Sequence, residues 1–571
     1  MTAIAAHSPA ERDGLRWAPV LTTGVFLVPI GAGLIGTLLP AFGYLPAIGG
    51  HQLSFGPWRE LLAFPGFATS LRLTVFTGIL TTILSVVLAM GLVAFGYGRP
   101  WTRRIGTYLA PLLSTPHSAL AIGFVFLIAP SGWIVRLVSP GITGWITPPD
   151  FATVGHPSGL ALVFGLLLKE VPFLILMIVG ALNQVPAHRH LLIARSLGYS
   201  RTVAWIKVVL PQIYPQVRLP IYAVLAFSLS VVDVALILGP SNPPTLAVLA
   251  VRWFTDADIR FYFPAAAAAC MQLALVIMLV AAWHALERLV AQVGRRWIAR
   301  GARSGIAPVA SALAAGTVCA LFALAVLSVV GMALWSFAVQ WRYPDVLPQA
   351  WTLNNWMRQG ASLAPPAWNT LVIGILAMTI ALVLSLACLE HEARLPKRVG
   401  PRMLWVLYLP LLVPQVAFLF GTQVFLVRLN FDGVLPAVIW MHLVYVLPYL
   451  FLSLADPWRA FDPRYVRSAR SLGASRWRTF FVIRVPLLLR PILIACAVAF
   501  AVSVGQYLPT LFAGNGRVAT LTTEAVTLSS GADRRVIGTW GLVQSVLPLC
   551  GFLLAGLLPT LLYAKRRGMG R

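Results

Sequence analysis

The chain has 571 residues, of which 59% are hydrophobic and only 11% are charged. Soluble globular domains carry about 25% charged residues, so this composition excludes an ordinary soluble domain, and it equally excludes a disordered chain. The formal net charge is +26, from 43 Lys and Arg against 17 Asp and Glu. In a soluble protein such a charge would indicate nucleic-acid binding. The function of the charge in this chain depends on where the Lys and Arg residues lie.

Apolar runs of about 18 residues or more are long enough to cross the hydrocarbon core of a bilayer. In chain order, such runs predict twelve membrane-spanning helices. The first run is too long for the apolar region of a cleavable signal peptide. Two of the runs are interrupted, 217–239 by Pro220 and Asp233, and 403–427 by Pro410 and Pro414. The twelve runs cover approximately residues 18–41, 70–96, 106–129, 158–182, 217–239, 263–285, 308–338, 367–389, 403–427, 434–455, 488–513 and 538–563.

The basic residues are distributed unequally between the two sides of this predicted topology. If the N-terminus is cytoplasmic, the cytoplasmic segments hold 31 Lys and Arg, the opposite side holds 11, and Lys169 lies inside a span. An excess of Lys and Arg in cytoplasmic loops is the usual orientation signal of inner-membrane proteins. We therefore predict a multi-pass protein of the bacterial inner membrane with both termini in the cytoplasm. The positive charge then reflects topology and the lipid bilayer, and no nucleic-acid partner is expected.

The two halves of the chain share a repeated segment. Residues 194–201 read Ala-Arg-Ser-Leu-Gly-Tyr-Ser-Arg and residues 469–476 read Ala-Arg-Ser-Leu-Gly-Ala-Ser-Arg, so seven of eight positions are identical. Six predicted spans separate the copies, and because six is even, both copies lie on the same side of the membrane. The sequence thus predicts an all-α polytopic membrane protein made of two parallel six-helix modules, residues 1–300 and 301–571.

Each copy predicts a short helix, an elbow and a second helix. Gly198 and Gly473 suit a residue with positive φ that ends the first helix. Ser200 and Ser475 can cap the second helix. The surrounding loops, 183–216 and 456–487, lie on the cytoplasmic side in the predicted topology. An element of this kind is joined at both ends to membrane helices, so a displacement of the element can be transmitted to those helices.

The Ala-x-x-Leu-Gly pattern, followed by Leu210-Pro211 or Val485-Pro486, resembles the coupling motif of ABC importer permeases. In that family the short helix sits in a cleft of an ATPase subunit, and ATP-driven closure of the ATPase dimer switches the access of the permease. The motif usually has Glu-Ala-Ala before Leu-Gly, and the acidic residue is absent from both copies here. The resemblance implies that the following residues contact the ATPase dimer: Ala194, Arg195, Ser196, Leu197, Gly198, Ala469, Arg470, Ser471, Leu472 and Gly473.

Two copies in one chain resemble the fused permeases of iron(III) and thiamine uptake systems. The resemblance covers about residues 60–300 and 360–567. It implies a separate periplasmic substrate-binding protein, since no large extramembrane domain is present in this sequence. Thiamine and iron(III) are the substrates that the resemblance favours.

ATP hydrolysis requires a separate subunit. A P-loop needs Gly immediately before its Lys, and the four lysines are preceded by Leu168, Ile206, Pro396 and Ala564. The chain is therefore interpreted as a non-catalytic transport subunit without a cofactor of its own, with ATP and magnesium bound by the partner ATPase. The alternative is an ion- or proton-coupled secondary transporter with the same duplication. That alternative predicts more charged residues at mid-membrane, and it gives no reason for the repeated elbow.

Asp233 and Gln506 are candidates for the translocation path. An ionisable group inside a span costs about 2.5–3.5 kcal/mol on insertion scales, so it is a functional candidate by default. Asp233 follows Ser230 by three residues, and Gln506 follows Ser503 by the same distance. The two residues thus occupy like positions in the two modules. We expect them to face one another across the pseudo-two-fold axis, and the carboxylate of Asp233 suits a cation.

Glu170 and His442, in equivalent spans of the two halves, are further candidates for the path. A lone histidine in a span is more often packed and hydrogen-bonded than functional, and Lys169 beside Glu170 can instead contact a neighbouring helix. No catalytic constellation such as HExxH or GxSxG is present. The charged segment 390–392 is interpreted as a segment that lies at the membrane surface and not as a metal site, so no metal is expected.

Overall fold

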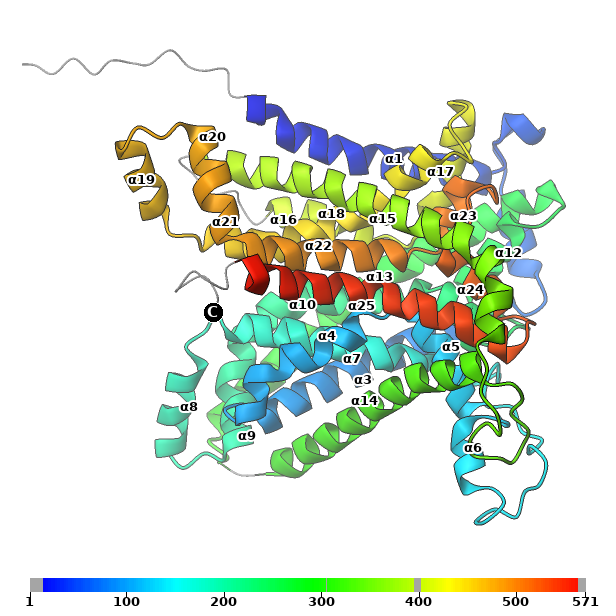
Figure 1. The fold of residues 1–571 in the computed structure, drawn as a ribbon, viewed down its shortest axis with the longest axis horizontal. Coiled ribbons are helices and arrows are strands. Elements are labelled where there is room, and N and C mark those ends of the chain that lie inside the picture. Colours follow the sequence, from blue (N-terminus) through cyan, green and yellow to red (C-terminus); the bar gives the residue numbers. More distant parts are fainter. Residues whose placement is uncertain (1–13, 304, 395–401, 563–571) are drawn as a thin grey trace, which may run out of the picture.

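The computed structural model describes residues 14–303, 305–394 and 402–562, which form helices and connecting loops without a β-strand. The long helices run side by side along one direction (Figure 1), as in an all-α polytopic membrane protein. The two ends of the chain, 1–13 and 563–571, for which a cytoplasmic location is predicted, lie outside the described residues.

Apart from the short helices Gly56–Ala63 and Trp133–Val138 of the first half and Val485–Leu487 of the second, the helices follow the same order in the two halves of the chain. The first half contains α1 (Ala18–Ala41), α2 (Gly56–Ala63), α3 (Phe67–Gly96), α4 (Ile105–Ser114), α5 (His117–Ile128), α6 (Trp133–Val138), α7 (Leu160–Leu182), α8 (Ala187–Ser196), α9 (Arg201–Ala204), the π-helical turn η4 (Trp205–Val209), α10 (Leu210–Ser230), α11 (Asp233–Leu238), α12 (Leu246–Phe254) and α13 (Tyr262–Ala299).

The second half contains α14 (Ala307–Phe337), α15 (Asn354–Arg394), α16 (Arg402–Leu412), α17 (Val416–Arg428), α18 (Leu435–Arg459), α19 (Pro463–Ser471), α20 (Arg476–Thr479), the π-helical turn η6 (Phe480–Arg484), α21 (Val485–Leu487), α22 (Leu489–Val504), α23 (Leu508–Gly514), α24 (Leu521–Leu528) and α25 (Arg534–Leu562). Short 3₁₀ turns cover Gly14–Trp17, Pro46–Ile48, Pro100–Arg104 and Ile259–Phe261.

The repeat extends well beyond the segment found in the sequence. The backbone N–H of Leu246, at the start of α12, donates to Thr74 Oγ1 at 2.9 Å. The backbone N–H of Leu521, at the start of α24, donates to Thr370 Oγ1 at the same distance. Thr74 and Thr370 occupy matching places on α3 and α15, so equivalent helices make equivalent contacts in the two halves.

Breaks within helices reduce the number of continuous spans. Among the described residues, nine helices are long and apolar enough to cross a membrane, or eleven if each of two bent pairs counts as one span. The predicted run 403–427 bends by 101° between α16 and α17, and Pro414 lies at the bend. The run 217–239 is divided between α10 and α11, and the run 106–129 divides at Pro116. Proline lacks an N–H and disfavours helix in the residue before it, which explains the breaks at Pro116 and Pro414.

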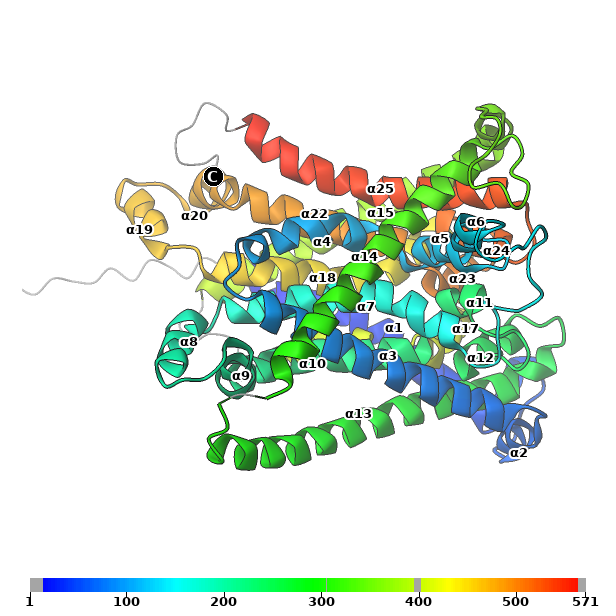
Figure 2. The same cartoon turned by 90° about the horizontal axis from the view of Figure 1, so that it is seen from below.

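The first helix of each half packs against the other half. Helix α1 lies against α15, α17 and α18 as well as α13, and α14 lies against α3, α5 and α7 as well as α25. Figure 2 shows α14 crossing obliquely over helices of the first half. The predicted module boundary at residues 300–301 falls in the connection between α13 and α14. The modules are thus consecutive in sequence but interlocked in space.

Three glycines allow α1 to approach α17 closely. A Cβ on Gly421 would collide with the carbonyl oxygen of Gly33, and a Cβ on Gly36 would lie 2.8 Å from the carbonyl oxygen of Gly421. The N–H of Gly421 donates to Thr37 Oγ1 at 3.1 Å, and Thr422 Oγ1 donates to the carbonyl of Pro29 at 2.9 Å. Lipid supplies no hydrophobic drive for two helices to associate, so close backbone packing and interhelical hydrogen bonds hold this contact.

The change Gly421→Ala is expected to lower the free energy of unfolding by about 1–3 kcal/mol, because the added methyl group forces α1 away from α17. The matched control is Gly31→Ala on α1, where a Cβ would have no neighbour within 4 Å. Thermal unfolding of both variants in detergent gives the comparison. Equal melting temperatures would contradict the assigned packing.

Candidate functional site

The two repeated elbows project from the same end of the molecule (Figure 1), which we call the elbow end. The first elbow comprises α8, Gly198, α9 and η4, and the second comprises α19, Gly473, α20 and η6. Gly198 has φ +86° and Gly473 has φ +83°, as the sequence predicted. Residues with a Cβ rarely adopt this conformation, so glycine is needed where each short helix ends.

The predicted serine caps are present in only one elbow. Ser475 Oγ accepts the N–H of Arg478 at 3.2 Å, which confirms the cap of α20. The prediction for Ser200 was wrong, because its hydroxyl is buried and has no hydrogen-bond partner in the described part of the chain. The backbone N–H of Ser200 donates instead to the carbonyl of Arg303, at 3.0 Å. The connection between α13 and α14 therefore lies against the first elbow.

Both elbows expose the same side chains. Ala194 and Ala469 are buried against the molecule, whereas the Arg, Ser, Leu and Gly that follow them are exposed. Leu197 is 57% exposed and Leu472 is 88% exposed. Each elbow thus presents a leucine outward, available to a partner protein.

The elbows are anchored to different elements. In the first elbow, Lys207 Nζ donates to the carbonyl oxygens of Trp297 and Ala302, at 3.2 and 2.8 Å. In the second elbow, Arg484 pairs with Glu390 on α15 at 2.5 Å. Helix α13 therefore holds one elbow, and the end of α15 holds the other.

The broken ends of spans receive hydrogen bonds from side chains of neighbouring helices. Lys169 Nζ donates to the carbonyl oxygens of Leu112, Leu113 and Thr115, at 3.3, 2.8 and 2.6 Å. These carbonyls lie at the end of α4, where no helical N–H follows to satisfy them. Lys169 thus closes the end of α4, a role that its sequence neighbours do not reveal.

The ends of α10 and α22 are satisfied in a similar way. Gln272 Nε2, on α13, donates to the carbonyl of Leu229 at 3.0 Å. Thr522 Oγ1 donates to the carbonyl of Val504. Gln544 Nε2, on α25, in turn donates to Thr522 Oγ1 at 2.7 Å. A glutamine at matching places of α13 and α25 therefore supports the break in each half.

The predicted path residues Asp233 and Gln506 lie at these breaks. Asp233 is the first residue of α11, and Gln506 lies between α22 and α23; both are partly exposed. The carboxylate of Asp233 interacts electrostatically with His117 and with Tyr507. Tyr507 follows Gln506 directly, so the breaks of the two halves lie near one another.

His117, which interacts with Asp233, also pairs with Glu170. His117 Nε2 lies 3.4 Å from Glu170 Oε1, with the side chain of His117 34% exposed and that of Glu170 6% exposed. Sequence reasoning missed His117 and Tyr507. The signal that could have found His117 is its position directly after Pro116, at the break between α4 and α5.

His442 is buried beside the break of the second half, because its partner Thr510 also donates to the backbone carbonyl of Gln506. Its Nδ1 is 2.8 Å from Ser503 Oγ, and its Nε2 is 2.8 Å from Thr510 Oγ1. Both ring nitrogens are thus satisfied, and the side chain joins α18 to α22 and α23. A contribution of His442 to the path stays a prediction.

The chain resembles membrane components of transport systems. Residues 384–564 match the family described as the binding-protein-dependent transport system inner membrane component. The chain is 34% identical to the inner membrane ABC transporter permease protein YnjC of Escherichia coli K12, over 97% of this chain and 98% of that protein.

Shorter similarities involve two further permeases of Escherichia coli K12. The spermidine/putrescine transport system permease protein PotB is 27% identical, over 27% of this chain and 63% of its own length. The molybdenum transport system permease protein ModB is 29% identical, over 31% of this chain and 88% of its own length.

The change Lys169→Met is expected to reduce the free energy of unfolding by about 3 kcal/mol. It leaves three carbonyl oxygens without their donor, and a buried unsatisfied polar group costs roughly 1–3 kcal/mol. Leu168→Met is the matched control, a swap of similar volume at the adjacent buried position. Chemical or thermal unfolding measures the difference. A variant as stable as the control would refute the capping role of Lys169.

Proposed function

The chain belongs to the ABC transporter permeases that form the inner membrane component of binding-protein-dependent transport systems, and from this premise we propose that it imports a small solute driven by ATP. ATP is hydrolysed by a dimer of separate ATPase subunits. A periplasmic binding protein delivers the solute to the end opposite the elbows. Alternating access between the two ends then releases it to the cytoplasm.

The observation that carries this proposal is the duplicated elbow. Two elements of matching sequence and backbone project at one end, each with an exposed leucine directly before the glycine. One chain can thus occupy both subunits of an ATPase dimer. The 31 Lys and Arg on the predicted cytoplasmic side support placing the elbow end in the cytoplasm.

The elbows are continuous with the broken spans. The first elbow leads through η4 directly into α10, whose end carries the break before Asp233. The second leads through η6 and α21 into α22, whose end carries the break before Gln506. A displacement of an elbow by the ATPase therefore reaches the residues proposed to line the path without an intervening flexible loop.

The groups at the breaks favour a cation as the solute. Asp233 and Glu170 supply two carboxylates that interact with one histidine, His117, and Asp233 also interacts electrostatically with Tyr507. A carboxylate attracts a cation and repels an oxyanion at short range. Thiamine and iron(III) are therefore the substrates to assay first, and an oxyanion such as molybdate is disfavoured.

The paired change Leu197→Asp and Leu472→Asp is expected to weaken binding of the partner ATPase at least about tenfold, since a charge replaces an apolar contact in a protein interface. Both side chains are exposed, so folding should be unaffected. Leu53→Asp, 70% exposed in the loop before α2 near the opposite end, is the control (Figure 2). Co-purification with the ATPase in detergent measures the effect. Unchanged binding by the paired variant would overturn the docking role of the elbows.

The change Asp233→Asn is expected to slow ATP-dependent uptake about tenfold, the effect of losing roughly 1.4 kcal/mol of stabilisation. Asp258→Asn, in the exposed loop before α13, is the matched control. Uptake is measured in proteoliposomes that contain the ATPase and the binding protein. Normal uptake by Asp233→Asn would remove this residue from the path, and uptake without any ATPase would favour the ion-coupled alternative.

A further inference from the structure

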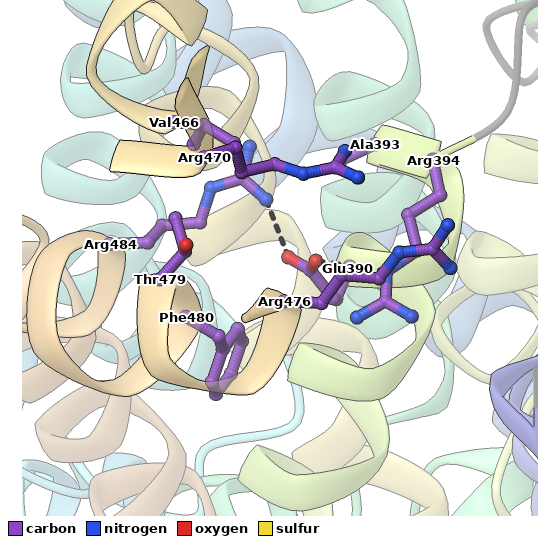
Figure 3. A pocket seen from close by; sticks show the side chains of 9 residues that line it. All are labelled: Glu390, Ala393, Arg394, Val466, Arg470, Arg476, Thr479, Phe480 and Arg484. Carbon is purple, nitrogen blue, oxygen red and sulfur yellow. Dashed lines mark hydrogen bonds and ion pairs between the residues drawn. The ribbon is translucent and has the colours of Figure 1, made fainter. Parts of the chain in front are cut away.

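A cavity of about 370 Å³ lies at the elbow end, between the end of α15 and the second elbow (Figure 3). Its volume is within the range of about 300–1,000 Å³ that is typical of small-ligand pockets. Helix α15 contributes two of the polar side chains, and the second elbow contributes the others. The polar groups that line it are Glu390, Arg394, Arg470, Arg476, Thr479 and Arg484.

The charges that line this cavity do not balance. Four guanidinium groups face a single carboxylate. Both oxygens of that carboxylate are already engaged, Oε1 with Arg394 Nε at 3.1 Å and Oε2 with Arg484 Nη1 at 2.5 Å. The lining thus carries three positive charges in excess. Like charges held together destabilise one another, and a bound anion relieves the repulsion.

Two of the arginines are available to such an anion. Arg470, on α19, and Arg476, on α20, form no ion pair with a carboxylate in the described part of the chain. They approach the cavity from the two sides of Gly473. Arg484 supplies a further group, because its Nε is buried and has no hydrogen-bond partner among the described residues, although the side chain is only 12% exposed. A buried N–H without an acceptor is costly.

We propose that this cavity binds a phosphate group. The planar guanidinium of arginine donates two parallel hydrogen bonds to phosphate oxygens, and several such groups around one cavity neutralise a multiply charged anion. The phosphate comes either from a free phosphate compound or from the headgroup of an anionic phospholipid at the membrane surface. In both cases it joins the second elbow to α15.

The first elbow offers a matched comparison. Arg195 and Arg201 occupy the positions of Arg470 and Arg476 in an almost identical segment. Arg195 lies near Arg201, and burial together with Arg99 and Arg195 lowers the pKa of Arg201. However, the connection between α13 and α14 lies against the first elbow, where the N–H of Ser200 donates to the carbonyl of Arg303, although Arg195 itself is exposed. The cavity lined by four arginines and Glu390 lies at the second elbow, so the phosphate site is assigned there.

Binding of phosphate at this cavity does not depend on the proposed function. The effect of that binding on transport rests on the proposed function. If ATPase subunits push both elbows, a phosphate that fastens the second elbow to α15 makes the response of the two halves unequal. Measurement on the chain without an ATPase therefore tests the site separately from the transport proposal.

The experiment uses the full chain in nanodiscs of phosphatidylcholine, titrated with inorganic phosphate in an isothermal calorimeter. Saturable binding is expected, and it should weaken at least about tenfold in the paired variant Arg470→Gln and Arg476→Gln. The paired variant Arg195→Gln and Arg201→Gln should bind as the unchanged chain does. If the first paired variant fails to fold, Arg476→Lys replaces it in the test. This change keeps the charge but loses the planar guanidinium, so phosphate should bind more weakly.

A second arm identifies the source of the phosphate group. In nanodiscs that contain phosphatidylglycerol, native mass spectrometry counts the lipids retained by each variant. Retention that depends on Arg470 and Arg476, without binding of free phosphate, assigns the site to a lipid headgroup. Failure of both arms, equal losses in the two paired variants, or occupancy seen only when the ATPase is added would each overturn the proposal.

Discussion

The arrangement of this protein depends on the need to satisfy backbone hydrogen bonds where no water is available. A continuous helix meets this need by itself within a membrane, but a broken helix leaves carbonyl groups exposed at its end. The breaks here are accommodated because Lys169 supplies three hydrogen bonds to the end of α4, and Gln272 and Thr522 serve α10 and α22. These polar side chains inside the bundle are therefore needed for the fold itself, before any role in transport.

The same breaks form the proposed place of solute recognition. Only an interrupted helix brings side chains such as Asp233 and Gln506 to a helix end inside the bundle, next to His117 and Tyr507. Helix α10 joins the first break to its elbow, and the helical segment 476–487 and α22, which meet at a bend of 75°, join the second break to its elbow. In the proposed function, these helices connect a polar centre to the remote elbows, where the ATPase attaches.

The two halves are alike in backbone and unlike in charge. The first half gathers Glu170, His117 and Asp233 near the centre, whereas the second half has Gln506 at the place of Asp233. At the elbow end the second half instead gathers arginines around Glu390. Fusion of two modules in one chain allows each half to specialise, since a change in one copy does not alter the other.

The sequence by itself determined the helical membrane fold, the duplication and the positive φ of Gly198 and Gly473, because these depend on local composition and on neighbours within a few residues. It overstated the number of continuous spans, since proline marks where a helix breaks but not how the chain continues. Tertiary structure alone decided that α1 and α14 exchange partners, that Lys169 closes α4, and that His117 meets Glu170. It also made Ser475 a cap and left Ser200 without a partner in nearly identical segments, because the chain packed against each elbow comes from a distant part of the sequence.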